Sequence, residues 1–154
     1  MGVKESDDGT FWMDIEDMKK YFDRVQVCKI HDDFTYTNSR VENASEAVFK
    51  VEIPTPGKYT FSVSQIGERM FPKDSGYEYS DCRCFLVKIN EGGSETKVTY
   101  IKGQKTMKTR DAYLEIEDLE EGSYYFVTEV DWLEGTETQR YTVTSYGAGG
   151  AVWE

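Results

Sequence analysis

After residue 23, apolar and polar side chains alternate in short segments, and this period of two is the feature that most constrains the fold. The clearest case is Lys58–Ile66, in which aromatic and aliphatic residues alternate with threonine and serine. Such alternation is typical of a strand with one face in a core and the other in solvent. The other segments of this kind are Arg24–Ile30, Ala47–Ile53, Cys82–Asn90, Glu95–Ile101, Ala112–Asp118, Ser123–Trp132 and Gln139–Tyr146.

The connections between these segments carry the residues of tight turns, such as Pro54–Gly57, Glu91–Ser94 and Glu121-Gly122. Short strands at this spacing, without long helices between them, predict an all-β protein: an antiparallel β-sandwich of about eight strands with one short N-terminal helix. We place the sandwich at residues 24–147 and a flexible, glycine-rich tail at residues 148–154. The side chains expected to be buried are Phe49, Val51, Tyr59, Phe61, Val63, Phe85, Val87, Leu114, Ile116, Phe126, Val130 and Val143.

One segment, Asp14–Phe22, has the spacing of a helix. Its apolar residues Ile15, Met18 and Phe22 recur at offsets of three and seven, and Asp14 is a suitable N-cap. A helix this short is marginal alone in water, so its apolar side needs a surface to pack against. Residues 1–23 are therefore predicted to form an N-terminal segment distinct from the sandwich.

The charge and cysteine content narrow the class of protein. The 29 acids and 18 bases give a net charge of −11, which disfavours binding to nucleic acid. We find neither an apolar run long enough to cross a membrane nor an apolar signal region after Met1. The three cysteines are an odd number, which favours a reducing compartment and a cytoplasmic, non-secreted protein. Cys82 and Cys84 are expected on one face of a strand, without the further ligands that zinc would need.

Several motifs resemble the calpain family. The segment Asp8–Met13 (DGTFWM), followed by the helix, resembles the junction that closes the calpain protease core and leads into a C2-like sandwich. Pro56–Gln65 and Leu119–Tyr125 are similar to two strands of that sandwich, which is also called domain III. Segments near Val130–Trp132 and Ser145–Gly147 are more similar to divergent calpain-like proteins of protists than to animal calpains.

The same resemblance argues against catalysis by this chain. In calpains the nucleophilic Cys, the His base and the orienting Asn all precede the DGTFWM-type junction, and here seven residues precede it. His31 follows the junction, and no family motif surrounds Cys28, Cys82 or Cys84. We therefore expect no enzymatic activity, no catalytic residue and no organic cofactor.

A calcium site is an alternative that the resemblance brings in, because C2-like domains of this family are linked to calcium and phospholipid. The candidate ligands are Glu117, Asp118, Asp131 and Glu134, with Glu137 in the same loop, if the two groups meet at one edge of the sandwich. The chain would then be a calcium-dependent, phospholipid-binding peripheral membrane module. Met1–Ser6 also fits a loose N-myristoylation pattern, although one acyl chain anchors only marginally.

The interpretation that we favour is a non-catalytic, calpain-type C2-like module for protein association. It would regulate a calpain-family protease in a longer parent or act as a structural subunit of an assembly; a fragment of an active calcium-dependent cysteine protease is the remaining alternative. The partner would be a protein or the protease core itself, because apolar residues of the junction would face that core. The expected contact residues are Phe11, Trp12, Ile15, Met18 and Phe22.

Overall fold

The computed structural model describes residues 11–91, 96–136 and 138–154. It divides the chain into two compact units, Met1–His31 and Asp32–Glu154. The N-terminal unit is therefore longer than the 23 residues expected, because residues 24–31 do not join the sandwich. The Met1–Ser6 pattern and the first three residues of the DGTFWM motif lie outside the described residues.

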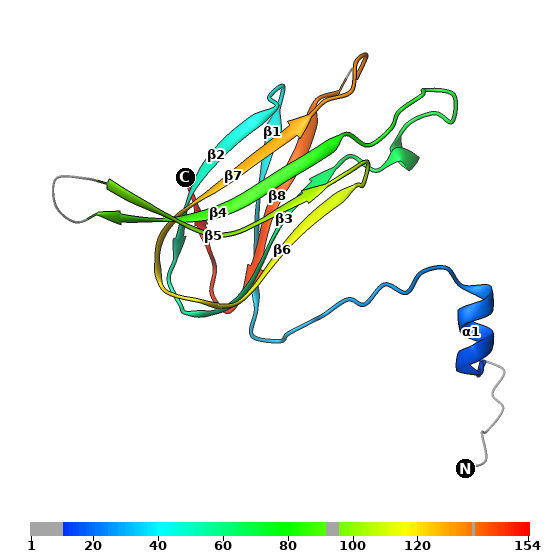
Figure 1. The fold of residues 1–154 in the computed structure, drawn as a ribbon, viewed down its shortest axis with the longest axis horizontal. Coiled ribbons are helices and arrows are strands. Elements are labelled where there is room, and N and C mark those ends of the chain that lie inside the picture. Colours follow the sequence, from blue (N-terminus) through cyan, green and yellow to red (C-terminus); the bar gives the residue numbers. More distant parts are fainter. Residues whose placement is uncertain (1–10, 92–95, 137) are drawn as a thin grey trace, which may run out of the picture. The chain divides into compact units, whose positions relative to one another are not determined.

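The second unit is an antiparallel β-sandwich, which confirms the predicted fold class (Figure 1). One sheet has the order β1-β8-β3-β6 and the other has the order β5-β4-β7-β2-β9. A short 3-10 helix, Glu68–Met70, lies in the connection between β3 and β4. The strands are β1 Thr35–Glu42, β2 Glu46–Ile53, β3 Gly57–Gln65, β4 Asp81–Glu91, β5 Thr96–Thr106, β6 Asp111–Leu119, β7 Gly122–Asp131, β8 Arg140–Gly147 and β9 Val152–Trp153.

An aromatic cluster holds the two sheets together. Phe61 of β3 and Phe126 of β7 meet across the sandwich with ring centroids 5.4 Å apart, and both side chains are completely buried. Trp153 packs edge-on against both rings, at 6.1 Å from Phe61 and 5.8 Å from Phe126. Tyr59 is also buried, and its ring lies where a side chain on Gly147 would be, so that only glycine fits at position 147. The alternation in β3 and β7 thus fixes which faces of the two sheets meet.

A buried glutamine organises one end of the sandwich. The Gln65 side chain donates to the carbonyl oxygens of Ser80 and Thr109 and accepts from the Ser80 amide. Its amide group is therefore satisfied although Gln65 is only 3% exposed. These bonds tie the end of β3 to the start of β4 and to the β5–β6 connection, and so they anchor the long loop of residues 66–80.

Most of the predicted core is confirmed, but the burial expected for β4 is wrong. Cys82, Cys84 and Leu86 face the core, whereas Phe85 and Val87 lie on the outer face and are only partly buried. Phe49 is also only partly buried, at the border of the core. The error on β4 has a clear cause, because both faces of this strand carry apolar residues and alternation cannot distinguish them.

The first strand also differs from the prediction. Arg24–Ile30 alternates in sequence but forms no strand, and Val25 and Val27 are exposed. A strand is stable only as part of a sheet, and in the described part of the chain this segment belongs to neither sheet. The first strand is instead β1, a polar edge strand that pairs with β8 from Thr35↔Gly147 to Glu42↔Arg140. Only Val41 of β1 is buried, so its sequence shows no clear alternation.

The predicted flexible tail is part of the sandwich. Ala151 is buried, and the short strand β9 pairs with β2 through Val51↔Trp153 and Glu52↔Val152. The glycines allow close approach here: a side chain on Gly149 would come within 3.0 Å of Thr55. Trp153 holds the segment in place through its ring contacts and through a hydrogen bond from Nε1 to Thr37 Oγ1.

Phe61→Ala is expected to lower the free energy of unfolding by about 3–5 kcal/mol, because it removes a fully buried ring that contacts Phe126 of the other sheet. Urea unfolding followed by tryptophan fluorescence measures this change. Tyr36→Ala is the matched control, since Tyr36 is an aromatic residue of the same sheet that is 60% exposed, and it should have little effect. Equal effects of the two substitutions would contradict the assignment of faces.

Candidate interaction site

The N-terminal unit contains helix α1, Ile15–Tyr21, which has seven residues. The Asp14 side chain caps it by accepting a hydrogen bond of 2.8 Å from the Glu16 amide, and Lys19 forms an ion pair with Glu16 at 3.0 Å. Acids in the first turn and lysines in the last turn suit the helix dipole. In the described parts of the chain, no helix is both long enough and apolar enough to cross a membrane.

The apolar side chains of this unit are largely exposed. Phe11 and Trp12 are 70% and 77% exposed, Ile15 and Phe22 are more than half exposed, and Met18 is partly buried. No residue of α1 is buried. We call residues Phe11–Phe22 the N-terminal apolar segment. Exposed aromatic and aliphatic side chains concentrated in one short segment are typical of a surface that contacts another molecule.

The acidic residues considered as calcium ligands fall into two separate groups. Glu117 and Asp118 lie at the end of β6, whereas Asp131 and Glu134 lie at and after the end of β7. The two groups are at opposite ends of β7, whose ten residues span about 30 Å. In residues 11–91, 96–136 and 138–154, no group of three or more His, Cys, Asp or Glu side chains could hold a metal ion. The remaining candidate, Glu137, lies outside the described residues.

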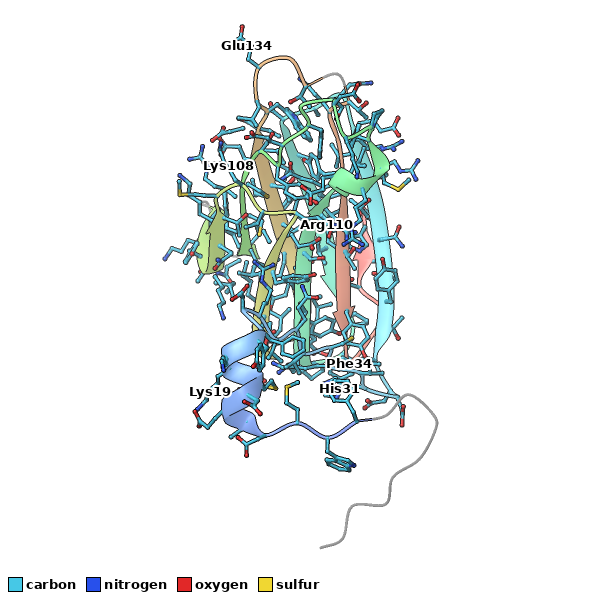
Figure 2. All side chains as sticks on the ribbon, turned by 90° about the vertical axis from the view of Figure 1, so that its right-hand side faces the viewer. Lys19, His31, Phe34, Lys108, Arg110 and Glu134 are labelled. Carbon is cyan, nitrogen blue, oxygen red and sulfur yellow. The ribbon has the colours of Figure 1, made fainter. Side chains whose placement is uncertain are left out.

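Two of these four acids form ion pairs on the surface. Glu117 accepts from Lys58 Nζ at 2.7 and 2.8 Å, and this bond raises the pKa of Lys58. Asp131 is 3.3 Å from Arg83, which also binds Glu129 at 2.6 Å. Asp118 and Glu134 are exposed, and Glu134 points away from the sandwich at the tip of its loop (Figure 2). The structure therefore does not bring the four acids together.

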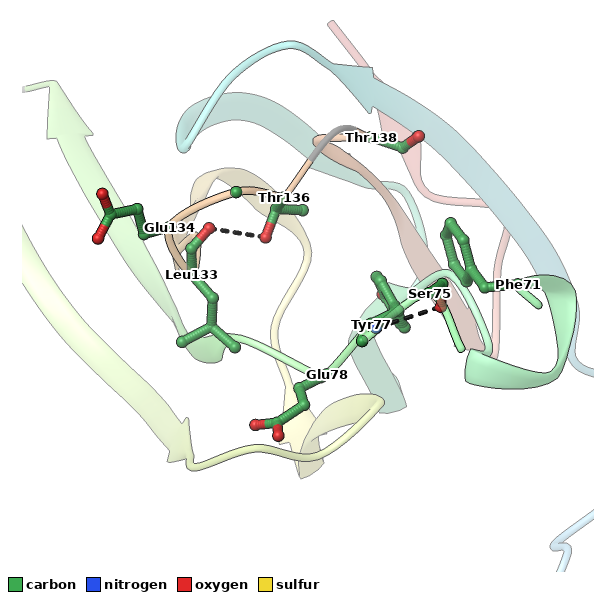
Figure 3. A pocket seen from close by; sticks show the side chains of 10 residues that line it. Phe71, Ser75, Tyr77, Glu78, Leu133, Glu134, Thr136 and Thr138 are labelled. Atoms are coloured by element: carbon green, nitrogen blue, oxygen red, sulfur yellow. Dashed lines mark hydrogen bonds between the residues drawn. The ribbon is translucent and has the colours of Figure 1, made fainter. Parts of the chain in front are cut away.

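A pocket of about 200 Å³ lies between the 66–80 loop and the β7–β8 loop (Figure 3). Phe71 and Tyr77 stack on one side with their ring centroids 4.0 Å apart, and the Tyr77 hydroxyl donates to the Ile66 carbonyl. Leu133 and Thr136 line the other side, where the Thr136 hydroxyl donates to the Leu133 carbonyl. The sequence did not indicate that these two loops would face each other.

Two of the three thiols are unsuited to nucleophilic chemistry. Cys82 and Cys84 lie on one face of β4, as their spacing predicted, and the structure shows that this face is buried in the core. Cys28 is exposed in the N-terminal unit. Burial raises the pKa of the Cys82 thiol to about 12 and that of Cys84 to about 11. Because the thiolate is the nucleophile, these two residues stay protonated and unreactive at neutral pH.

These shifts predict a loss of stability at alkaline pH. In the unfolded chain both thiols titrate near a pKa of 9.0, whereas the folded state keeps them protonated to about 11 and about 12. Above pH 9 the unfolded chain therefore loses protons that the folded chain retains, and the free energy of unfolding falls as the pH rises, while below pH 9 these groups have no effect. Urea midpoints from about pH 8 to about pH 11 measure the fall. It should be smaller in a Cys82→Ala, Cys84→Ala variant, and an equal fall would contradict the assignment.

Comparison with known proteins relates the N-terminal unit to one family. Residues 1–29 match the family model described as calpain family cysteine protease, which covers 29 of 154 residues. No curated protein matches the chain. A solved structure that is similar is the Yersinia pseudotuberculosis-derived mitogen, with 15% sequence identity, a TM-score of 0.43, and coverage of 73% of this chain and 83% of that one. The chain thus contains an antiparallel β-sandwich, preceded in the sequence by a segment that matches a calpain-family model and includes the N-terminal apolar segment.

Proposed function

We propose that this chain is a non-catalytic module that binds a calpain-type protease core through its N-terminal apolar segment, Phe11–Phe22. The contact would regulate the protease or hold it in an assembly, whether the core belongs to the same polypeptide or to another. The observation that carries the proposal is the exposure of Phe11 and Trp12 within the residues that match a calpain-family model. The same segment thus matches a calpain-family model and exposes aromatic side chains within its own unit.

The energetics of α1 support a partner for this segment. A helix of seven residues has little stability of its own, and its cap and the ion pair between Glu16 and Lys19 contribute only modestly. Burying Trp12, Ile15 and Phe22 would supply about 1.5–3 kcal/mol for each side chain, which is enough to order the helix. Tryptophan is also among the residues most enriched at the centres of interfaces.

The chemistry of the thiols is consistent with a module without peptidase activity. The thiols of Cys82 and Cys84 are protonated in the core, and the three free cysteines fit a reducing compartment such as the cytoplasm. We therefore assign binding, and no bond cleavage, to this chain. Calcium-stimulated cleavage of casein by the purified chain would overturn that assignment.

Trp12→Ala should weaken binding to a calpain-type core by about 2 kcal/mol or more, which is the range of an interface hot spot. The tagged chain is used to recover proteins from an extract of its native cells, and mass spectrometry identifies those that carry the Cys, His and Asn of a calpain core. Wild type is expected to recover such a protein and the variant to lose most of it.

Tyr36→Ala serves as the control, because it removes an exposed aromatic side chain of the sandwich and should leave recovery unchanged. Melting curves of all three proteins separate binding from folding. Equal recovery by wild type and Trp12→Ala, together with a lower melting temperature of the variant, would show that Trp12 packs within the chain and would remove the main support for the proposal.

A further inference from the structure

The outer faces of the two sheets differ sharply. On the sheet β1-β8-β3-β6, the outward residues of the two central strands are mostly hydroxyl residues, such as Thr60, Ser64, Thr142 and Thr144. Such a face is typical of a sheet exposed to water. On the sheet β5-β4-β7-β2-β9, eight apolar residues gather on the outer face of the first four strands, with charged residues such as Arg83, Glu129 and Lys50 beside them. We call this group the outer apolar face: Val48, Phe85, Val87, Ile89, Val98, Tyr100, Tyr125 and Val127.

The strand register makes these residues neighbours. Phe85 lies between Gly103 and Val127, and Val48 lies on the far side of Val127. In the next row Val87 lies between Tyr100 and Tyr125. Val48, Val98 and Tyr100 are each more than 60% exposed. The first row crosses all four strands without a charged residue, whereas the second row is apolar from β5 to β7 and ends at Lys50 on β2. The four strands lie side by side in Figure 1.

A glycine on β5 shapes this surface. A side chain on Gly103 would come within 2.6 Å of the Tyr100 hydroxyl and 3.1 Å of Phe85 Cβ. Tyr100 can therefore fold back over the strand, toward Phe85, only because position 103 is glycine. Tyr100 thereby adds its ring to the apolar residues of β4 that could pack against another sheet.

Beside the apolar rows, the charges are arranged asymmetrically. The next row along the strands reads Lys105, Arg83, Glu129 and Glu46 from β5 to β2, so positive charge lies on one side and negative charge on the other. If a second copy is placed face to face by a two-fold axis parallel to the strands between β4 and β7, the order of this row is reversed. Lys105 of each copy then faces Glu46 of the other, and Arg83 faces Glu129.

The same operation matches the apolar rows. Phe85 of one copy faces Val127 of the other, and Val87 faces Tyr125. We propose that the outer apolar face binds a second copy of this chain in this two-fold arrangement, which makes the protein a homodimer. The proposal concerns a surface separate from Phe11–Phe22 and does not depend on the function proposed above. The net charge of −11 opposes self-association at long range, but salt at about 0.15 M screens that repulsion beyond about 8 Å.

Sedimentation velocity of the whole chain over a concentration series tests the dimer. Wild type is expected to shift from monomer to dimer as its concentration rises. Val127→Lys, which places a charge at the centre of the face, should abolish the dimer. Thr144→Lys is the matched control on the outer face of the other sheet and should dimerise like wild type. A monomeric wild type, or a Val127→Lys variant that is folded by its melting curve and still dimeric, would overturn the proposal.

A charge exchange tests the orientation. Lys105 and Glu46 lie on different strands separated by β4 and β7, so exchanging either charge leaves the core intact. Lys105→Glu alone and Glu46→Lys alone should each weaken self-association about tenfold or more, because like charges then face each other twice. A mixture of the two variants should form a heterodimer near wild-type affinity, since both pairs become opposite in sign. Failure of the mixture to recover the dimer would exclude this two-fold arrangement.

Discussion

The contact between Phe61 and Phe126 is the constraint on which the sandwich depends. It joins β3 of one sheet to β7 of the other, and Trp153 closes the cluster from the short last strand. Because successive side chains of a strand point to opposite faces, this one contact decides which residues of both strands reach solvent. The hydroxyl face of one sheet and the apolar face of the other both follow from it. A shift of one residue in β7 would bury Tyr125 and Val127 and expose Phe126.

The N-terminal unit is stabilised differently from the sandwich. Its helix is short, its cap and ion pair lie on the surface, and its apolar side chains remain exposed. A sandwich of this size supplies its own core, but a seven-residue helix cannot, so its stability has to come from whatever covers it. This dependence explains why the segment that matches a calpain-family model is also the one that we expect to bind.

Electrostatics acts on this protein at two length scales. The net charge of −11 is a property of the whole chain and limits the kinds of partner. The row from Lys105 to Glu46 acts locally. Its ability to pair with a second copy depends on the order of its charges across four strands and not on their sum. Position also decides the role of the acids predicted as calcium ligands, because β7 separates the two groups by its full length.

The sequence by itself determined the all-β class, the strands with one apolar face, the position of Cys82 and Cys84 on the same face of one strand, and the apolar spacing of Ile15, Met18 and Phe22. These features follow from local periodicity, which a single segment carries within itself. Tertiary structure alone decided which face of β4 is buried, because Phe85 and Leu86 are both apolar and only the neighbouring strands distinguish them. It also paired the polar strand β1 with β8, left Arg24–Ile30 outside both sheets and brought Trp153 back against the core. These outcomes depend on contacts between residues far apart in the chain, and a pattern read along the chain contains no information about them.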